Sequence, residues 1–178
     1  MIKTAINKRL AFNGLLLLAI LSFVWFIAQQ SNKRILVDSL YDSAMGNDIH
    51  SIVIHYQKIE NTLAIDAEIE LKKIENQWRM LKPINSPIDE RKIKHLTTLL
   101  FDEIDASYPI EGKDLSVFGL DADRVSVAFN GVKIQFGSLN PISHKRYVQK
   151  GNRIYLVAET VYGLLIGGVS GFMPINPH

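Results

Sequence analysis

The sequence contains no cysteine among its 178 residues. This absence excludes disulfide bridges, zinc sites with thiolate ligands, a cysteine nucleophile and lipid attachment through a cysteine. An excess of one charge is also lacking beyond the N-terminus, since residues 31–178 carry 17 Lys and Arg against 18 Asp and Glu. Without a global positive field, we expect no nucleic-acid partner, because such partners are held largely through their phosphates.

The short motifs of common enzyme classes are absent as well. No G-x-x-x-x-G-K-[ST], G-x-G-x-x-G, H-E-x-x-H or G-x-S-x-G pattern occurs. Asp121 and Asp123 look like the start of a calcium loop, but the glycine and glutamate that such a loop needs are replaced by other residues. His50 and His55 lie five apart in a predicted strand and therefore point to opposite faces. We predict no catalytic residue, no metal site and no cofactor, hence a protein that is not an enzyme.

One long apolar run stands out against this background. It extends over residues 10–28 as LAFNGLLLLAILSFVWFIA, nineteen residues without a charge. As a helix it would measure about 28 Å, close to the ~30 Å hydrocarbon core of a bilayer. Its length, and the bulky Phe26 where a cleavage site needs a small residue, favour an uncleaved anchor over a signal peptide, with a buried core helix as the third alternative. We predict a single transmembrane helix that contacts the lipid bilayer through residues 10–28.

The charges beside this run predict its orientation. Lys3, Lys8 and Arg9 precede it, whereas Lys33 and Arg34 follow it. The larger basic count on the first side predicts cytoplasmic residues 1–9. Residues 29–48 then form a juxtamembrane segment whose apolar side chains recur at helical spacing: Ile35, Leu36, Leu40, Ala44 and Met45. The pattern predicts an amphipathic helix that packs on the following domain or contacts a membrane surface or a partner, and the first alternative is favoured.

Residues 49–178 are predicted to form an extracytoplasmic α+β domain. Its first part contains strands over 49–56, 63–71 and 77–81, then a helix from a Ser86-Pro87 start to about residue 104. Residues 106–123 lack periodicity and indicate an ordered loop. Its second part contains a hairpin over 124–136 that turns at Asn130-Gly131, a second over 146–158, and a closing helix over 159–166. The fold class is therefore an antiparallel β-rich domain with one well-defined helix, and the order of elements admits two meander-plus-helix halves.

Several motifs of this domain resemble one known family. They are Trp78 with Pro83 and the helix that follows, Leu115 to Leu120 (LSVFGL), Phe136-Gly137, Asn140, Arg146-Tyr147-Val148 and Ile154 to Val157 (IYLV). Over about residues 49–157 the chain resembles the domain of unknown function 4340 (DUF4340) family, as a single-copy, membrane-anchored member. The resemblance implies a bacterial inner (plasma) membrane protein with a periplasmic domain. Some relatives are associated with transporter components of the gliding-motility type, and no catalytic residue is carried over.

Two functions are consistent with these observations. The first is a membrane-anchored interaction module that binds an envelope protein partner, accessory to a transporter-type membrane complex, with open sheet edges that could accept a partner strand. The second is an extracytoplasmic small-ligand receptor or enzyme that uses the loops of residues 118–147. Its candidate ligand-binding residues are Arg146, which would grip an anion, Asn140, which would orient it, and Tyr147 beside them.

Overall fold

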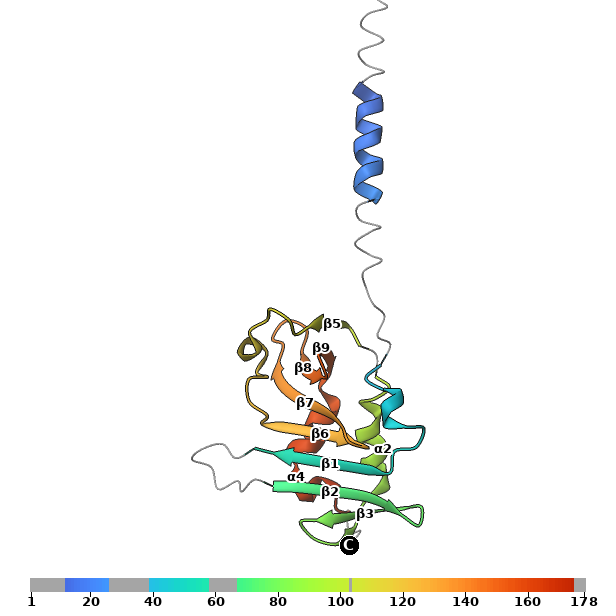
Figure 1. The fold of residues 1–178 in the computed structure, drawn as a ribbon, viewed down its shortest axis with the longest axis vertical. Helices are drawn as coiled ribbons and strands as arrows, with labels where there is room; N and C mark the ends of the chain where they lie inside the picture. The colour runs from blue at the N-terminus through green and yellow to red at the C-terminus, as the bar shows by residue number, and fades with distance from the viewer. Residues whose placement is uncertain (1–11, 26–38, 58–66, 103, 175–178) are drawn as a thin grey trace, which may run out of the picture. The chain divides into compact units, whose positions relative to one another are not determined.

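The computed structural model describes residues 12–25, 39–57, 67–102 and 104–174 (Figure 1). The chain divides into two compact units, residues 1–36 and 37–178. The first unit contributes one described helix, and the second contains the β-sheet and its covering helices.

The helix of the first unit corrects the predicted membrane anchor. It is described over residues 12–25, which are fourteen residues. Among the residues that the structure describes, no helix has both the length and the apolar character needed to cross a membrane. The prediction of a transmembrane helix over residues 10–28 is therefore wrong, and so are the single-pass arrangement and the inner-membrane location derived from it.

Nine strands form one antiparallel sheet in the described part of the second unit, in the order β4-β3-β2-β1-β6-β7-β8-β9-β5 (Figure 1). They are β1 (Ser51–Tyr56), β2 (Ala67–Ile74), β3 (Gln77–Lys82), β4 (Ser86–Pro87), β5 (Ala106–Pro109), β6 (Val125–Phe129), β7 (Val132–Leu139), β8 (Lys145–Lys150) and β9 (Arg153–Ala158). Two meanders, β1 to β4 and β6 to β9, meet where β1 pairs with β6, with Ile54 opposite Val127. The domain is thus built on a single continuous sheet.

Helical segments cover one face of this sheet and bury the main core. They are α2 (Glu90–Thr98), α3 (Tyr162–Ile166) and α4 (Gly168–Phe172), with the short turn η3 (Glu159–Val161) before α3. Alternate strand residues such as Ile54 and Val127 point to this face, as the two-residue period of a strand requires. They pack against Leu96, Leu165 and Phe172, all fully buried. The predicted helix over 159–166 is confirmed as η3 followed by α3.

The other face is partly covered by the chain between β5 and β6. This covering segment, residues 110–124, includes the turn η2 (Leu115–Phe118). It buries Leu120 against the sheet together with Ile154 and Leu156, outside the main core cluster. The Gln135 Nε2 atom donates hydrogen bonds of 3.1 Å to the carbonyls of Leu120 and Ala122. The sheet therefore has two unequal apolar layers, one under the helices and one under this segment.

Two expectations for the middle of the chain are corrected. The N-cap of α2 is Asp89, whose carboxylate accepts a 2.9 Å hydrogen bond from the Arg91 N–H, and not Ser86. Ser86 instead pairs with Met80 across β3 and β4, so its backbone is extended. The stretch over 106–123, expected to be a loop, contains β5 and η2. At Ser86, pairing with the preceding strand β3 overrides the local signal, and at β5 pairing with the distant strand β9 does so.

The segment before β1 is also different from its prediction. Residues 29–38 of the expected amphipathic helix lie outside the described residues. The rest contains only the short turn η1 (Ser43–Met45) and extended chain. Leu40 and Met45 are nevertheless buried in the main core. These two apolar residues therefore do pack on the domain, as predicted. The predicted helix is wrong for residues 39–48, which the structure describes.

The partly buried hydroxyl of Tyr56 is expected to make the stability of the protein depend on pH in the alkaline range. Its hydroxyl donates a 2.6 Å hydrogen bond to the Leu165 carbonyl, and burial raises the pKa of Tyr56 to about 12. Because the native pKa lies above the ordinary value near 10, its stabilising effect is complete below pH 10 and is lost as the pH rises through 12. In thermal denaturation at increasing pH, we expect the stability gap between the wild type and Tyr56→Phe to narrow over this window. A constant gap would contradict this expectation.

Candidate functional site

Arg146 lies on the helix-covered face of β8 and is held by three groups. Its Nε and Nη2 atoms donate hydrogen bonds of 2.6 and 2.7 Å to the two carboxylate oxygens of Glu159, and its Nη1 atom donates a 2.5 Å bond to the Gly137 carbonyl. The guanidinium also stacks 3.4 Å from the ring centroid of Tyr162. Its side chain is only 11% exposed. A bidentate carboxylate and an aromatic face are strong partners for arginine, so this contact connects β8 to the closing helix.

Asn140 and Tyr147 lie on the opposite side of the sheet from Arg146. Successive strand residues point to opposite faces, which separates Tyr147 from its neighbour Arg146. The Asn140 Nδ2 atom donates a 2.6 Å hydrogen bond to the Tyr147 hydroxyl. The Tyr147 ring makes an edge-to-face contact with Phe118 at 5.0 Å between centroids. Of the three predicted ligand-binding residues, the structure therefore brings two together and places the third elsewhere.

The loop after β7 is held in shape by Asn140. Its Oδ1 atom accepts hydrogen bonds of 2.9 and 3.1 Å from the backbone N–H groups of Ile142 and Ser143. This is an Asx turn, in which a side chain replaces a backbone acceptor. The polar atoms of Asn140 are thus engaged within the loop and with Tyr147, and their shown role is to fix the conformation of residues 140–143.

The neighbouring turn η2 is equally well fixed. The Asp114 carboxylate accepts hydrogen bonds from the hydroxyl and the backbone N–H of Ser116, and these bonds hold the pKa of Asp114 below its ordinary value. Behind the turn, the backbone of Gly137 passes so close to Phe118 that an added Cβ would lie 2.3 Å from the Phe118 carbonyl oxygen. Only glycine allows this approach of β7 to η2.

Two large apolar side chains project into solvent from these two segments. Val117 is 71% exposed and Ile142 is 90% exposed. We call them the loop surface. Their segments adjoin, because Gly119 packs against Ser138 and Phe118 against Tyr147. Leu139 is also 41% exposed, but it pairs with Arg146 and therefore lies on the other face of the sheet. Scattered exposed apolar residues are ordinary, whereas apolar side chains gathered on one surface are typical of interaction sites.

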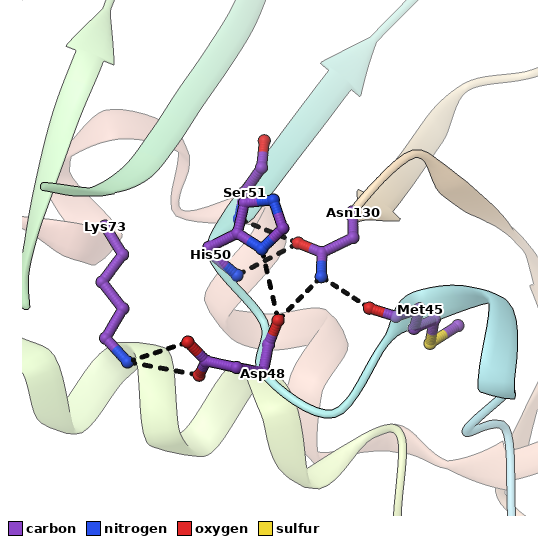
Figure 2. A network of polar contacts seen from close by, with 6 residues as sticks. All are labelled: Met45, Asp48, His50, Ser51, Lys73 and Asn130. Atoms are coloured by element: carbon purple, nitrogen blue, oxygen red, sulfur yellow. Dashed lines mark hydrogen bonds and ion pairs between the residues drawn. The ribbon is translucent and has the colours of Figure 1, made fainter.

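A second polar network lies at the turn between β6 and β7 (Figure 2). The Asn130 Oδ1 atom accepts hydrogen bonds of 3.0 Å from the backbone N–H groups of His50 and Ser51. Its Nδ2 atom donates to the carbonyls of Met45 and Asp48, at 2.6 and 2.9 Å. All four hydrogen-bonding positions of the amide are therefore used.

This network attaches the segment before β1 to the hairpin. Lys73 supports it from β2, with its ammonium 3.2 Å from the Asp48 carboxylate. Asn130 has a positive φ of 47°, and Gly131 of 88°, as the two-residue turn requires. Sequence reasoning identified Asn130-Gly131 as a turn but missed the role of the side chain, and it also missed Glu159 as the partner of Arg146. Neither contact has a local sequence signal, because each depends on strand register.

No grouping of three or more metal-ligating side chains occurs among residues 12–25, 39–57, 67–102 and 104–174. Asp123, one of the two residues weighed for a calcium loop, forms an ion pair with Lys133. Comparison of the chain with protein-family models, curated proteins and solved structures gave no match. The resemblance to the DUF4340 family therefore stays a prediction.

Proposed function

We propose that this protein is an interaction module that binds a protein partner through the loop surface of Val117 and Ile142. The observation that carries the proposal is the 90% exposure of Ile142 on a turn that Asn140 fixes by two hydrogen bonds. When the backbone that carries an apolar side chain is already fixed, less conformational entropy is lost when a partner covers that side chain. Such residues are suited to the desolvated centre of an interface.

The contacts of the predicted ligand-binding residues support the same proposal. The Arg146 guanidinium is directed to Glu159, Gly137 and Tyr162, on the face of the sheet opposite to Tyr147. Asn140 is engaged with its own loop. The alternative of a small-ligand receptor or enzyme built on Arg146 and Asn140 stays a prediction, and a stability measurement on Arg146 variants tests it below.

Site-specific photo-crosslinking tests the loop surface directly. A photoreactive amino acid placed at position 142 of the full-length chain in its native cells is expected to capture a defined protein. The matched control position is Ile84, which is 48% exposed in the connection between β3 and β4, at the other end of the strand order. A partner captured equally from positions 84 and 142, or from neither, would contradict the proposal.

A binding measurement with the captured partner gives the expected magnitude. Ile142→Ser is expected to weaken the Kd roughly thirtyfold, since truncating a central interface residue costs about 2 kcal/mol. Ile84→Ser should leave the Kd unchanged. Both exposed positions should tolerate serine with little change in thermal stability, which separates lost binding from lost folding. An unchanged Kd for Ile142→Ser would move the interface away from the loop surface.

A further inference from the structure

We propose that Asn130 is a deamidation site which the native fold keeps closed, and whose reaction detaches residues 45–50 from the β6–β7 turn. The inference is independent of the proposed function, since Asn130 and the loop surface are separate sets of residues. It starts from the sequence pair Asn130-Gly131 at an exposed hairpin turn, where glycine presents no side chain to hinder its own amide nitrogen.

The chemistry needs only water. The backbone nitrogen of Gly131 attacks the Cγ atom of Asn130, a C–N bond forms, the Cγ–Nδ2 bond breaks, and the side-chain nitrogen leaves as ammonia. Water then opens the resulting five-membered imide at either carbonyl and leaves aspartate or isoaspartate. One water is consumed and one ammonia is released, with no change of oxidation state.

The native hydrogen bonds oppose the first step. Attack requires Cγ to turn toward the Gly131 nitrogen, while both side-chain polar atoms are fixed to backbone groups of residues 45–51 (Figure 2). The leaving nitrogen itself is held by the carbonyls of Met45 and Asp48, at 2.6 and 2.9 Å. Deamidation therefore has to wait until this segment opens locally, and the fraction of open molecules sets the rate.

The product cannot restore the closed arrangement. An aspartate at position 130 would place a carboxylate oxygen against the Met45 and Asp48 carbonyls, where an N–H donor is required. Isoaspartate would lengthen the backbone of a two-residue turn whose dihedral angles are fixed by strand pairing. In either case the segment that carries the buried Met45 loses its side-chain attachment to this turn, while Ser51 keeps its backbone hydrogen bond to Asn130.

Comparing the deamidation rates of the native and the denatured protein tests whether the native hydrogen bonds protect Asn130. Purified full-length protein is incubated at mildly alkaline pH in native buffer and in denaturant, and peptide mass spectrometry follows Asn130. We expect the native rate to be at least about tenfold slower than the denatured rate. Asn13-Gly14, the other Asn-Gly pair of the sequence, confirms that the denatured chain reacts normally. Equal native and denatured rates at Asn130 would overturn the proposal.

A pair of methionine variants tests whether the segment of residues 45–51 protects Asn130 from deamidation. Met45→Ala removes the apolar anchor of the segment, and Met80→Ala removes an equally buried methionine in β3. In native buffer, we expect Asn130 to deamidate about tenfold faster in Met45→Ala than in Met80→Ala. The reason is that loss of the Met45 side chain favours local opening of the segment. Equal native deamidation rates in the two variants would overturn the inference that this segment protects Asn130. For wild-type protein already deamidated, unchanged hydrogen exchange over residues 45–50 would overturn the detachment.

Discussion

Asn130→Ala is expected to lower the free energy of unfolding by about 3 kcal/mol. The substitution removes four hydrogen bonds to backbone groups of residues 45–51, each with a net value of roughly 0.5–1.5 kcal/mol. Two of these bonds lie near solvent, which keeps the total toward the lower end. Alanine also has to adopt the positive φ of 47°, at a cost of roughly 1 kcal/mol. Urea denaturation measures the change.

One further variant separates the loss of the hydrogen bonds from the backbone strain, and a second serves as a control. Asn130→Gly removes the same four bonds but accepts a positive φ, so it should be less destabilising than Asn130→Ala. Asn152→Ala changes an exposed asparagine in the β8–β9 turn and should shift stability by about 0.5 kcal/mol or less. If Asn130→Ala and Asn152→Ala had equal effects, the network in Figure 2 would not contribute to stability.

The parts of the fold that the sequence predicts well are those with short-range signals. Asn130-Gly131 between two alternating runs predicts the β6–β7 hairpin, and the structure confirms it with Phe129 opposite Val132. The hairpin of β8 and β9 is confirmed as well, with Lys150 opposite Arg153. In both cases the turn residues and the two strands lie within about fifteen residues, so nothing distant has to be known.

The predictions that are wrong concern segments whose structure is decided by strand pairing or by other contacts that the local pattern does not show. Ser86-Pro87 has the local signature of a helix start, yet it pairs with Arg79 and Met80 as β4. Residues 106–109 show no periodicity, yet they form the edge strand β5 because β9 offers a free side. Hydrophobicity over residues 10–28 indicates a membrane span, whereas no helix among the residues that the structure describes is long and apolar enough to cross a membrane. In each segment the local signal is real, but the wider structural context decides the outcome.

The candidate site shows the same limit. The neighbours Arg146 and Tyr147 were combined into one anion site, although strand geometry alone places their side chains on opposite faces. Glu159 could not be assigned as the partner of Arg146 without the register of β8 and β9, which sets Arg146 opposite Val157. The predicted ligand-binding loops, residues 118–147, contain Ile142 but not Val117, so the sequence did not predict the loop surface. Its apolar character depends on which side chains remain uncovered after packing.

Arg146→Ala is expected to lower the free energy of unfolding by about 2–3 kcal/mol. The change leaves the Glu159 carboxylate and the Gly137 carbonyl without their donor and removes the stacking on Tyr162. Breaking a buried pair from one side costs roughly 3–5 kcal/mol, and the 39% exposure of the Glu159 side chain reduces that figure. Arg146→Lys should recover only a part, because lysine cannot form the bidentate contact.

A double-mutant cycle distinguishes this structural role from the ligand-binding prediction. If Arg146 acts through Glu159, Arg146→Ala and Glu159→Gln should be strongly non-additive, because the second change matters little once the first partner is gone. Additive effects would contradict the pairing. If Arg146 instead served an anionic ligand, Arg146→Ala would unfold at nearly the wild-type urea concentration. That result would return Arg146 to the list of binding residues, because a group that contributes little to stability would then be held in place for another purpose.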